Sequence, residues 1–499
     1  MQVYDYIVIG AGYGGLIAAD LLCQQSKSVL VLEAHSELGG CASNFYRSAK
    51  GFSFDVGATT ISGFDEPKSF GKALNKLGLK RQAQKYLKKL DIGMKVYYKD
   101  EIINRYSDPE LWLAENNRVF ADEKIINLWR WIFKIEKQAW QALDMNEALM
   151  PNDFFGFMKM IFNKNFFANF QHLNLMPLLF SSFQKTLVDF NVTNSDFVNF
   201  VDQQLLITAQ NSYKQTPTLS AVMGLNYPQE VYYPLGSINQ IANLIADDML
   251  KHNGKLLTRT KVENIEKNNG LYSVYDNQGA LYRAKALVAN LPIWSLEKIL
   301  NINSAKKKIS NITQEFNNAW GAFTVYFAFK ARLNLQTNYL QIHANKEISN
   351  CKTHLEHNGS IFVTLSEDND RSPSGWTSVT ISTHTHAQQW FDFSAENYKE
   401  QKQKTQDEIL ELLFTTIPEL RNCEKTAFMS GTPKTFYKYT NRENGFVGGI
   451  KHDINKPIIF MPQQKFSSQE DIFLVGDTSF PGQGIAAVSY SALSFAQKQ

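Results

Sequence analysis

Two glycine-rich segments, one near each end of the chain, restrict its fold more than any other feature. The first follows an apolar run that ends at Ile9, and the second follows another apolar run that ends at Val475. The glycines of the two segments are Gly10, Gly12, Gly14 and Gly15, and Gly476, Gly482 and Gly484. Such segments join a strand to a helix where backbone must pass close to a ligand. We therefore expect both ends of the sequence to fold onto one site.

The glycines of the first segment each have a mechanical reason. A tight strand-to-helix turn needs Gly10, close approach of a pyrophosphate needs Gly12, and close packing of helix on strand needs Gly15. The phosphates then lie at the helix N-terminus. A second apolar run, residues 29–32, leads to Glu33, where an acid accepts ribose hydroxyls and disfavours the additional phosphate of NADP. This pattern predicts a doubly wound, Rossmann-like α/β nucleotide-binding domain.

A second glycine pair, Gly39-Gly40, precedes Cys41, and a nicotinamide site has no obvious need of it. With this pair the chain resembles the flavin-dependent amine oxidase and phytoene desaturase superfamily. The resemblance continues through residues 51–57, 233–238, 254–265 and 286–292. It implies FAD as the cofactor, an amine oxidase-like fold, and a position beside the adenine for Val262.

The resemblance also implies roles for the second glycine-rich segment. Asp477 would bind the ribityl or phosphate oxygens, and residues 481–484 would open a helix aimed at the flavin pyrimidine, where reduction builds negative charge. The candidates expected to face the flavin are Phe480, Pro481 and Gln483. The expected cofactor-binding residues are Gly10, Gly12, Gly14, Gly15, Glu33, Gly39, Gly40, Cys41, Val262, Gly476, Asp477, Gly482, Gln483, Gly484 and Ile485. Arg47 and Tyr490 are expected to approach the cofactor.

Within the superfamily, the carotenoid branch is the most similar. Its cis-trans isomerases and terminal-end desaturases share a small residue after the glycine pair, here Cys41, and a Phe-Pro-Gly-Gln-Gly phrase, here residues 480–484. Residues 108–112, 149–154 and 200–205 resemble desaturases that act on acyclic carotenoids. The implied reaction is hydride transfer from the polyene to flavin with loss of a proton, after which a quinone or oxygen accepts the electrons.

Four alternatives stay open at this stage. The chain could be a carotenoid cis-trans isomerase working on reduced FAD, a polyene saturase or an amine oxidase. Outside the enzymes, it could be a non-catalytic flavin-binding carrier. The acid or base of the reaction is not identified by any motif.

The pattern divides the chain into two interleaved domains. The FAD-binding domain is expected to comprise residues 1–95, 225–300 and 465–499. The substrate domain is expected to comprise a mostly helical segment, 96–224, and a mixed α+β segment, 301–464. Alternating apolar residues predict strands at 322–329 and 376–383, and the pattern of 394–413 predicts a helix.

The helical segment contains a cluster of phenylalanines, with 12 of them between Phe154 and Phe200. Phe154, Phe157 and Ile161 follow helical spacing. One interpretation is a part, residues 150–200, that dips into the membrane and admits a lipid-soluble substrate. The other interpretation is ordinary core packing. Pro177 and several asparagines exclude a long membrane span.

The net charge and the spacing of the cysteines exclude further classes of protein. The net charge is +3, no basic tract is present, and nucleic acid is therefore not an expected partner. The four cysteines have no CxxC spacing, which argues against disulfides and a zinc knuckle. His384 and His386 share a strand face but have no evident third ligand, so no metal site is predicted. We expect a cytoplasmic protein that binds peripherally to membranes.

Overall fold

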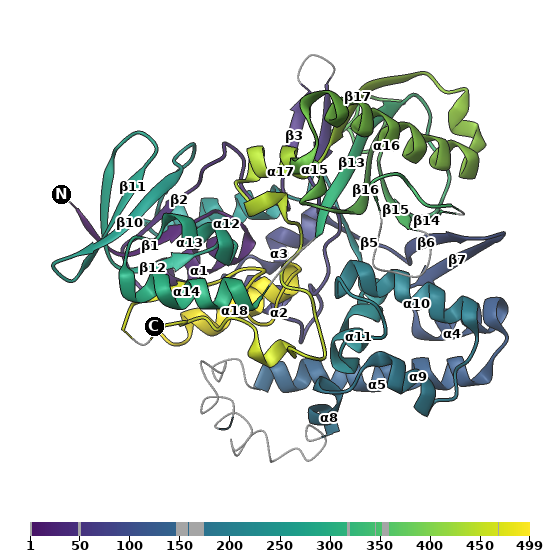
Figure 1. The fold of residues 1–499 in the computed structure, drawn as a ribbon, viewed down its shortest axis with the longest axis horizontal. Helices are drawn as coiled ribbons and strands as arrows, with labels where there is room; N and C mark the ends of the chain where they lie inside the picture. Colours follow the sequence, from purple (N-terminus) through teal and green to yellow (C-terminus); the bar gives the residue numbers. More distant parts are fainter. Residues whose placement is uncertain are drawn as a thin grey trace.

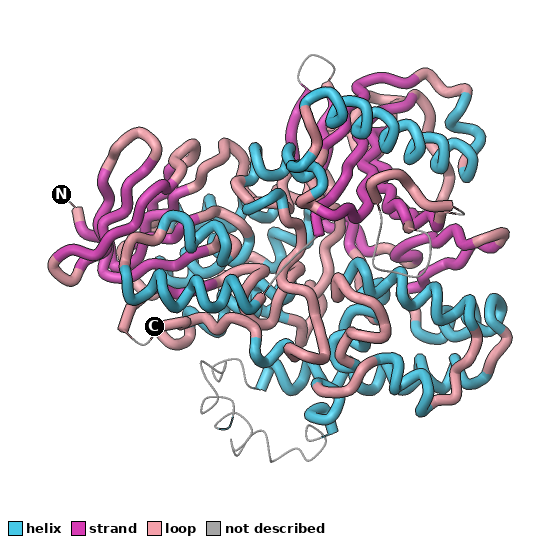
Figure 2. Tube along the Cα trace, in the orientation of Figure 1, coloured by secondary structure: helices cyan, strands magenta, loops and turns pink. Residues whose placement is uncertain are grey.

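The computed structural model describes residues 2–47, 51–145, 158, 174–316, 320–344, 346–351, 359–467 and 469–499. Two sheets and a layer of helices make up the molecule (Figure 1). In Figure 2, one group of strands lies at the left, the other lies at the upper right, and helices fill the lower right.

The first sheet is mostly parallel and is built from distant parts of the chain. Its order is β10-β11-β12-β1-β2-β9, and β18 also pairs with β12. The strands are β1 (Val3–Ile9), β2 (Val29–Leu32), β9 (Lys255–Leu257), β10 (Val262–Asn268), β11 (Leu271–Asp276), β12 (Leu281–Ala289) and β18 (Ile472–Leu474). The first half of β12 pairs antiparallel with β11, whereas its last residues pair in parallel with β18. The sheet therefore branches at β12.

Helices cover both faces of this sheet, because alternate residues of its buried strands are apolar on both sides. Val8 packs into one core with α1, α2, α12 and α18, whereas Ile7 and Ile9 pack into the other core with α13 and α14. The helices are α1 (Tyr13–Gln24), α2 (Ser69–Lys76), α3 (Lys80–Ala83), α12 (Gln240–Lys251), α13 (Ile293–Ile299), α14 (Asn303–Glu315) and α18 (Ile485–Ala496). The doubly wound fold predicted from the sequence is confirmed.

The second sheet has the order β17-β13-β16-β15-β14-β6-β7. Its strands are β6 (Ile92–Tyr98), β7 (Glu101–Tyr106), β13 (Trp320–Phe329), β14 (Tyr339–His343), β15 (Ser360–Ser366), β16 (Thr377–His386) and β17 (Lys425–Gly431). The strands predicted at 322–329 and 376–383 are confirmed as β13 and β16. Phe323, Val325 and Phe327 point into a core shared with α16 (Ala395–Thr416), which confirms the helix predicted at 394–413. Along the chain, helix α15 (Gln389–Asp392) comes directly after β16, and α17 (Pro433–Thr440) comes directly after β17.

A helical layer lies below the second sheet in Figure 1. It comprises α4 (Pro109–Phe120), α5 (Glu123–Met145), α8 (Met176–Leu179), α9 (Phe183–Asp189), α10 (Ser195–Thr208) and α11 (Thr218–Leu225). The mostly helical character expected of residues 96–224 is therefore seen after residue 108. The segment before it forms β6 and β7, which extend the second sheet, and β6 already begins at Ile92.

The phenylalanine-rich segment is described only in part. Phe154, Phe157 and Ile161 lie outside the described residues. Phe183, Phe197 and Phe200 are fully buried, so ordinary core packing holds for these three, whereas Phe180 is half exposed. Among the described residues, no helix combines the length and the apolar character needed to cross a membrane.

Two small two-stranded sheets and several 3-10 turns complete the fold. One sheet is a hairpin of β3 (Asn44–Arg47) and β4 (Phe52–Asp55), and the other pairs β5 (Leu87–Lys89) antiparallel with the distant strand β8 (Tyr232–Pro234). The turns are η2 (Gln84–Tyr86), η5 (Tyr227–Gln229), η6 (Pro418–Arg421), η7 (Glu443–Gly445) and η8 (Ile458–Phe460).

Candidate functional site

The first glycine-rich turn runs from β1 into α1 and packs against Asn290, the residue after β12. Gly10 has φ +97°, and a Cβ there would lie 2.6 Å from the Asn290 carbonyl oxygen. A Cβ on Gly12 would lie 2.6 Å from Asn290 Oδ1, and one on Gly14 would lie 3.1 Å from Asn290 Nδ2. A Cβ on Gly15 would collide with the Gly10 carbonyl oxygen. Packing against backbone alone therefore requires glycine at positions 10 and 15, before any ligand is considered.

Asn290 joins the two ends of the site, a role that the resemblance through residues 286–292 did not predict. Its Nδ2 donates to the Val475 carbonyl oxygen at 2.9 Å, and its backbone N–H donates to Ile9. A Cβ on Gly476 would lie 3.0 Å from the same Nδ2. Asn290 thus contacts both glycine-rich segments, bonding to the residue before the first through its backbone N–H and to the residue before the second through its side-chain amide.

Glu33 follows β2 and braces the first turn. Its Oε2 accepts the Ala11 N–H at 2.7 Å, and its Oε1 accepts the His35 N–H at 2.8 Å. Burial raises the pKa of the Glu33 carboxyl, and these backbone donors oppose that rise. A carboxylate has more lone pairs than these two bonds use, so Glu33 can still accept a ribose hydroxyl.

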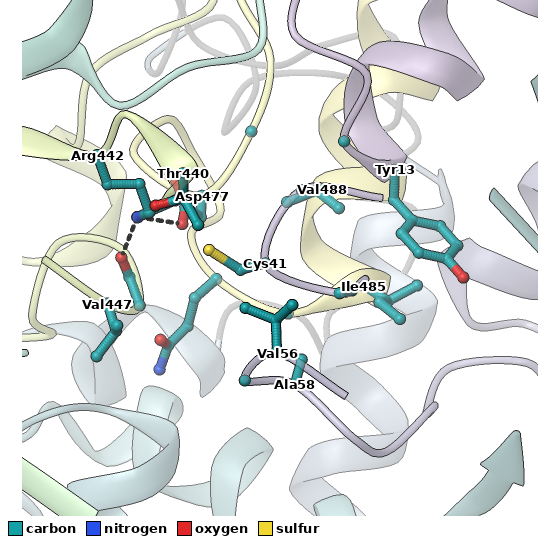
Figure 3. A pocket seen from close by; sticks show the side chains of 18 of the residues that line it. Tyr13, Cys41, Val56, Ala58, Thr440, Arg442, Val447, Asp477, Ile485 and Val488 are labelled. Carbon is teal, nitrogen blue, oxygen red and sulfur yellow. Dashed lines mark hydrogen bonds and ion pairs between the residues drawn. The ribbon is translucent and has the colours of Figure 1, made fainter. Parts of the chain in front are cut away.

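The second glycine pair lies against the first turn. Gly39 and Gly40 have φ +100° and +64°, and the Gly39 N–H donates to the Ala11 carbonyl at 2.9 Å. Gly39 also forms an isolated bridge with Gly12. The chain then delivers Cys41 into the site, where its side chain points toward Asp477 and Arg442 (Figure 3). Burial raises the pKa of the Cys41 thiol, as fits a packed small residue more than a reactive thiolate.

Asp477 is held by an arginine that the sequence does not single out. Arg442 Nη2 donates to Asp477 Oδ2 at 2.8 Å and also to the Gly448 carbonyl at 2.8 Å, while its Nε donates to Phe446. The guanidinium is almost fully buried, with 7% of Arg442 exposed. These bonds fix the Asp477 carboxylate at the wall of the site. Dashed lines mark bonds of Arg442 in Figure 3.

The helix start expected near residue 484 is α18, and its surroundings differ from the expectation in one respect. A Cβ on Gly484 would meet nothing within 4 Å, so the backbone there is uncovered. The Gln483 amide, however, is bonded to α10: its Nε2 donates to the Thr208 carbonyl at 2.9 Å, and its Oε1 accepts from Gln210 at 3.2 Å. Gln483 therefore ties the start of α18 to the helical layer, and its expected position facing the flavin stays a prediction.

These groups line one cavity of about 1740 Å³ that extends from the first sheet to the helical layer and the second sheet. The expected residues in its lining include Gly10, Gly12, Gly14, Glu33, Gly39, Gly40, Cys41, Val262, Gly476, Asp477, Phe480, Pro481, Gln483, Gly484, Ile485 and Tyr490. Gly15 and Gly482 lie outside this lining, because Gly15 packs on Gly10 and Gly482 packs toward His452. The side chain of Arg47 lies outside the described residues.

Two histidines in the lining were not expected to belong to the site. Burial lowers the pKa of His384 and of His452 to about 4, so both are neutral at pH 7. Neither ring nitrogen of His452 has a hydrogen-bond partner among the described residues. His384 lies edge-on to Trp320, and His386 stacks on the same ring, so an aromatic cluster accounts for this pair.

Comparison with known proteins identifies the class. Residues 13–446 match the family described as flavin containing amine oxidoreductase. Prolycopene isomerase 2, chloroplastic, of an Oncidium hybrid cultivar is 26% identical over 518 residues, covering 100% of this chain and 84% of that protein. The 4,4'-diaponeurosporene oxygenase of Staphylococcus aureus is 20% identical over 513 residues, covering 99% of this chain and 97% of that protein.

The fold itself is also found among solved structures. An oxidoreductase from Methanosarcina mazei superposes with a TM-score of 0.61 at 15% identity, covering 99% of both chains. The chain therefore belongs to the flavin containing amine oxidoreductase family. It is an FAD-dependent oxidoreductase.

The residues of the site fit FAD. The N-termini of α1 and α18 both open onto the cavity, and the neighbouring glycines leave backbone exposed where a pyrophosphate needs to approach. Glu33 can accept from the ribose, and Val262 lines the same end of the cavity. Arg442 holds the Asp477 carboxylate in the lining of the cavity, where its oxygens can accept hydroxyls of a ribityl chain.

Proposed function

We propose that this enzyme acts on a carotenoid or a related long polyene. The observation that carries the proposal is the extension of the cavity away from the nucleotide end, over a largely apolar wall. That wall includes Met94, Leu143, Leu175, Met176, Leu179, Leu340 and Phe362. A rigid apolar chain gains affinity by burying its surface there, with few hydrogen bonds needed to orient it. The names of the relatives support the same substrate class.

The residues of this chain bind and orient the substrate and exclude water. Bound FAD supplies a ring that takes up or returns electrons. The helix N-terminus of α18 stabilises negative charge at the cavity wall. Phe480 packs edge-on against Tyr490 with ring centroids 6.1 Å apart, which makes a dry wall beside the α18 turn.

We propose cis-trans isomerisation as the first candidate reaction. Its support is the sequence identity of 25–26%, over the whole of this chain, to proteins named prolycopene isomerases. This exceeds the 20% identity to the oxygenase. Isomerisation returns every proton, so it makes no demand for a strong base. This suits a lining in which His384 and His452 are weak bases.

Desaturation is the second candidate, and Lys402 is the observation that favours it. Lys402 lies on α16 in the cavity lining, and burial lowers the pKa of its ammonium. A lowered pKa makes this ammonium easier to deprotonate, and in its deprotonated form the amine can accept the proton that desaturation releases. The electrons then pass to a quinone or to oxygen. We further propose that the protein works at a membrane surface, where such substrates are stored.

The experiment compares oxidised and pre-reduced holoenzyme on a cis acyclic carotenoid in liposomes, without oxygen. Isomerisation predicts conversion only by reduced enzyme, with unchanged product mass and altered retention. Desaturation predicts a product two hydrogens lighter, formed by oxidised enzyme with an added quinone, and Lys402→Gln should then slow product formation without lowering FAD content. Binding of the polyene without conversion in any arm would contradict both reactions and support the carrier alternative.

A further inference from the structure

Outside the lining of the cavity, helices α1 and α12 bring two carboxylates and one imidazole together. Asp20 lies on α1, Asp248 lies in the last turn of α12, and His252 follows directly after that helix. One ligand atom from each lies within 4.8 Å of the others. The Asp20 side chain is fully buried, whereas 14% of the Asp248 side chain and 40% of the His252 side chain are exposed.

The arrangement has the spacing of a chelate on a helix. Asp248 and His252 are four residues apart, so they project from one face of α12 and one turn apart. Asp20 approaches from α1, which packs against α12. Three ligands from two helices can therefore reach one point, with the exposed edge of His252 as the path from solvent.

The distances favour a shared cation over direct hydrogen bonds. His252 Nδ1 lies 3.4 Å from Asp20 Oδ1 and 3.4 Å from Asp248 Oδ2. Both separations exceed the roughly 2.7–3.2 Å of a good N–H···O bond. Two ligand atoms of a tetrahedral zinc ion, each about 2.0–2.1 Å from the metal, are separated by about 3.3 Å. The two separations from His252 match the edge of that tetrahedron, and all three ligand atoms lie within 4.8 Å of one another.

Asp20 supplies an independent reason to expect a ligand. Neither of its carboxylate oxygens has a hydrogen-bond partner among the described residues, and the imidazole with which it pairs, that of His252, lies 3.4 Å away. A buried carboxylate without hydrogen bonds is costly, and buried charges in proteins are paired or coordinate metals. The side chain is thus placed for a positive partner stronger than a partly exposed imidazole.

We propose that Asp20, Asp248 and His252 bind a zinc ion, with water in the fourth position. Carboxylate oxygens and an imidazole nitrogen are ligands that zinc accepts, and no redox change is involved. The ion joins α1 to α12. Because α1 begins at the Gly12 to Gly15 turn, the ion braces the helix that carries the nucleotide site, and the proposal does not depend on the substrate.

The test uses purified holoenzyme, treated with chelator and dialysed, then titrated with zinc chloride by calorimetry. We expect one saturable site per chain and a melting temperature that rises with zinc concentration, since a ligand of the folded state stabilises it. Asp20→Asn and His252→Gln should each remove the saturable site and the rise in melting temperature. Asp20→Asn should fold well, because it removes a buried carboxylate that lacks partners.

Asp247→Asn is the matched control, because it makes the same charge change as Asp20→Asn at an exposed position of α12, next to Asp248. It should leave both the zinc stoichiometry and the thermal response unchanged. Absence of saturable binding to the wild-type chain would overturn the proposal. Equal loss of binding in Asp247→Asn and Asp20→Asn would also overturn it, because diffuse surface charge would then account for the binding.

Discussion

The double substitution Gly12→Ala with Asn290→Ala separates two reasons for glycine at the start of α1. Gly12 has φ −71°, so its backbone tolerates alanine. An added Cβ would nonetheless lie 2.6 Å from Asn290 Oδ1 and 3.6 Å from Asn290 Cγ. The amide must therefore move, although the family motif attributes the glycine to the approach of the pyrophosphate.

The structure sets the expected magnitudes. Overpacking of this kind costs about 1–3 kcal/mol of unfolding free energy. Asn290→Ala alone removes the bond to the Val475 carbonyl, which leaves a buried acceptor unsatisfied at a cost of about 1–3 kcal/mol. In the double variant the alanine at position 12 meets no amide, so the two costs should not add. We expect the double variant to be about as stable as Asn290→Ala.

Cofactor binding should behave differently from stability. The methyl group on residue 12 still occupies the path of the pyrophosphate in the double variant. A loss of 1.4 kcal/mol corresponds to a tenfold weaker affinity, and we expect Gly12→Ala and the double variant to lose about tenfold or more in FAD affinity. Flavin released by acid precipitation measures loading, and the melting temperature of the flavin-free proteins measures packing.

Two results would refute this reasoning. If the double variant regains full FAD affinity as well as stability, contact with Asn290 is the whole reason for the glycine. If Gly12→Ala binds FAD as the wild type does, the turn tolerates a side chain and the site was assigned wrongly. Ala18→Gly, a change inside α1 and away from the turn, controls for a general weakening of the helix.

Other changes test other parts of the structure. Arg442→Met should cost about 3–5 kcal/mol of unfolding free energy and lower the FAD content, because it leaves the Asp477 carboxylate without its buried partner. Arg442→Lys should restore part of the stability, measured by melting curves, and part of the FAD content, measured by absorbance. Phe180 and Phe460 are 51% and 50% exposed, and their ring centroids lie 6.4 Å apart. Changing both residues to Ser should weaken flotation with liposomes at unchanged FAD content, and flotation equal to that of the wild type would contradict membrane binding through these two rings. In zinc-free protein, burial raises the pKa of the Asp20 carboxyl to about 7, so the folded state holds this proton more tightly than the unfolded state. Stability is therefore lost as pH rises from about 4 to about 7, and the melting temperature of Asp20→Asn should exceed that of the wild type by a growing margin over that range. A difference in melting temperature that stays constant with pH would contradict the raised pKa of Asp20.

Local patterns predicted the parts of the site that depend on backbone conformation. Gly10 and Gly39 have positive φ, and Glu33 follows β2 directly, so spacing along the sequence was enough to find them. The acid was expected to serve only the ribose. In the structure it also braces the turn through Ala11, since a bond across 22 residues follows from the pairing of β1 with β2.

Residues whose role depends on distant contacts escaped prediction. Arg442 reaches Asp477 because η7 and the loop after it pass beside the second glycine-rich segment, and no motif marks that approach. No motif predicted the additional bond from the Gln483 amide to Thr208 of α10, because the two residues lie 275 positions apart in the sequence. Asp20 and His252 were missed for the same reason, because they meet only when α1 packs on α12.

The single amide of Asn290 also constrains the order in which a growing polypeptide can assemble. When synthesis has reached β12, the first glycine turn is already made, yet the Val475 carbonyl and β18, which complete its surroundings, are still 185 positions away. Until then the last residues of β12 are an open sheet edge, available to incorrect partners. The cofactor site is therefore complete only after β18 and the second glycine-rich segment have been synthesised.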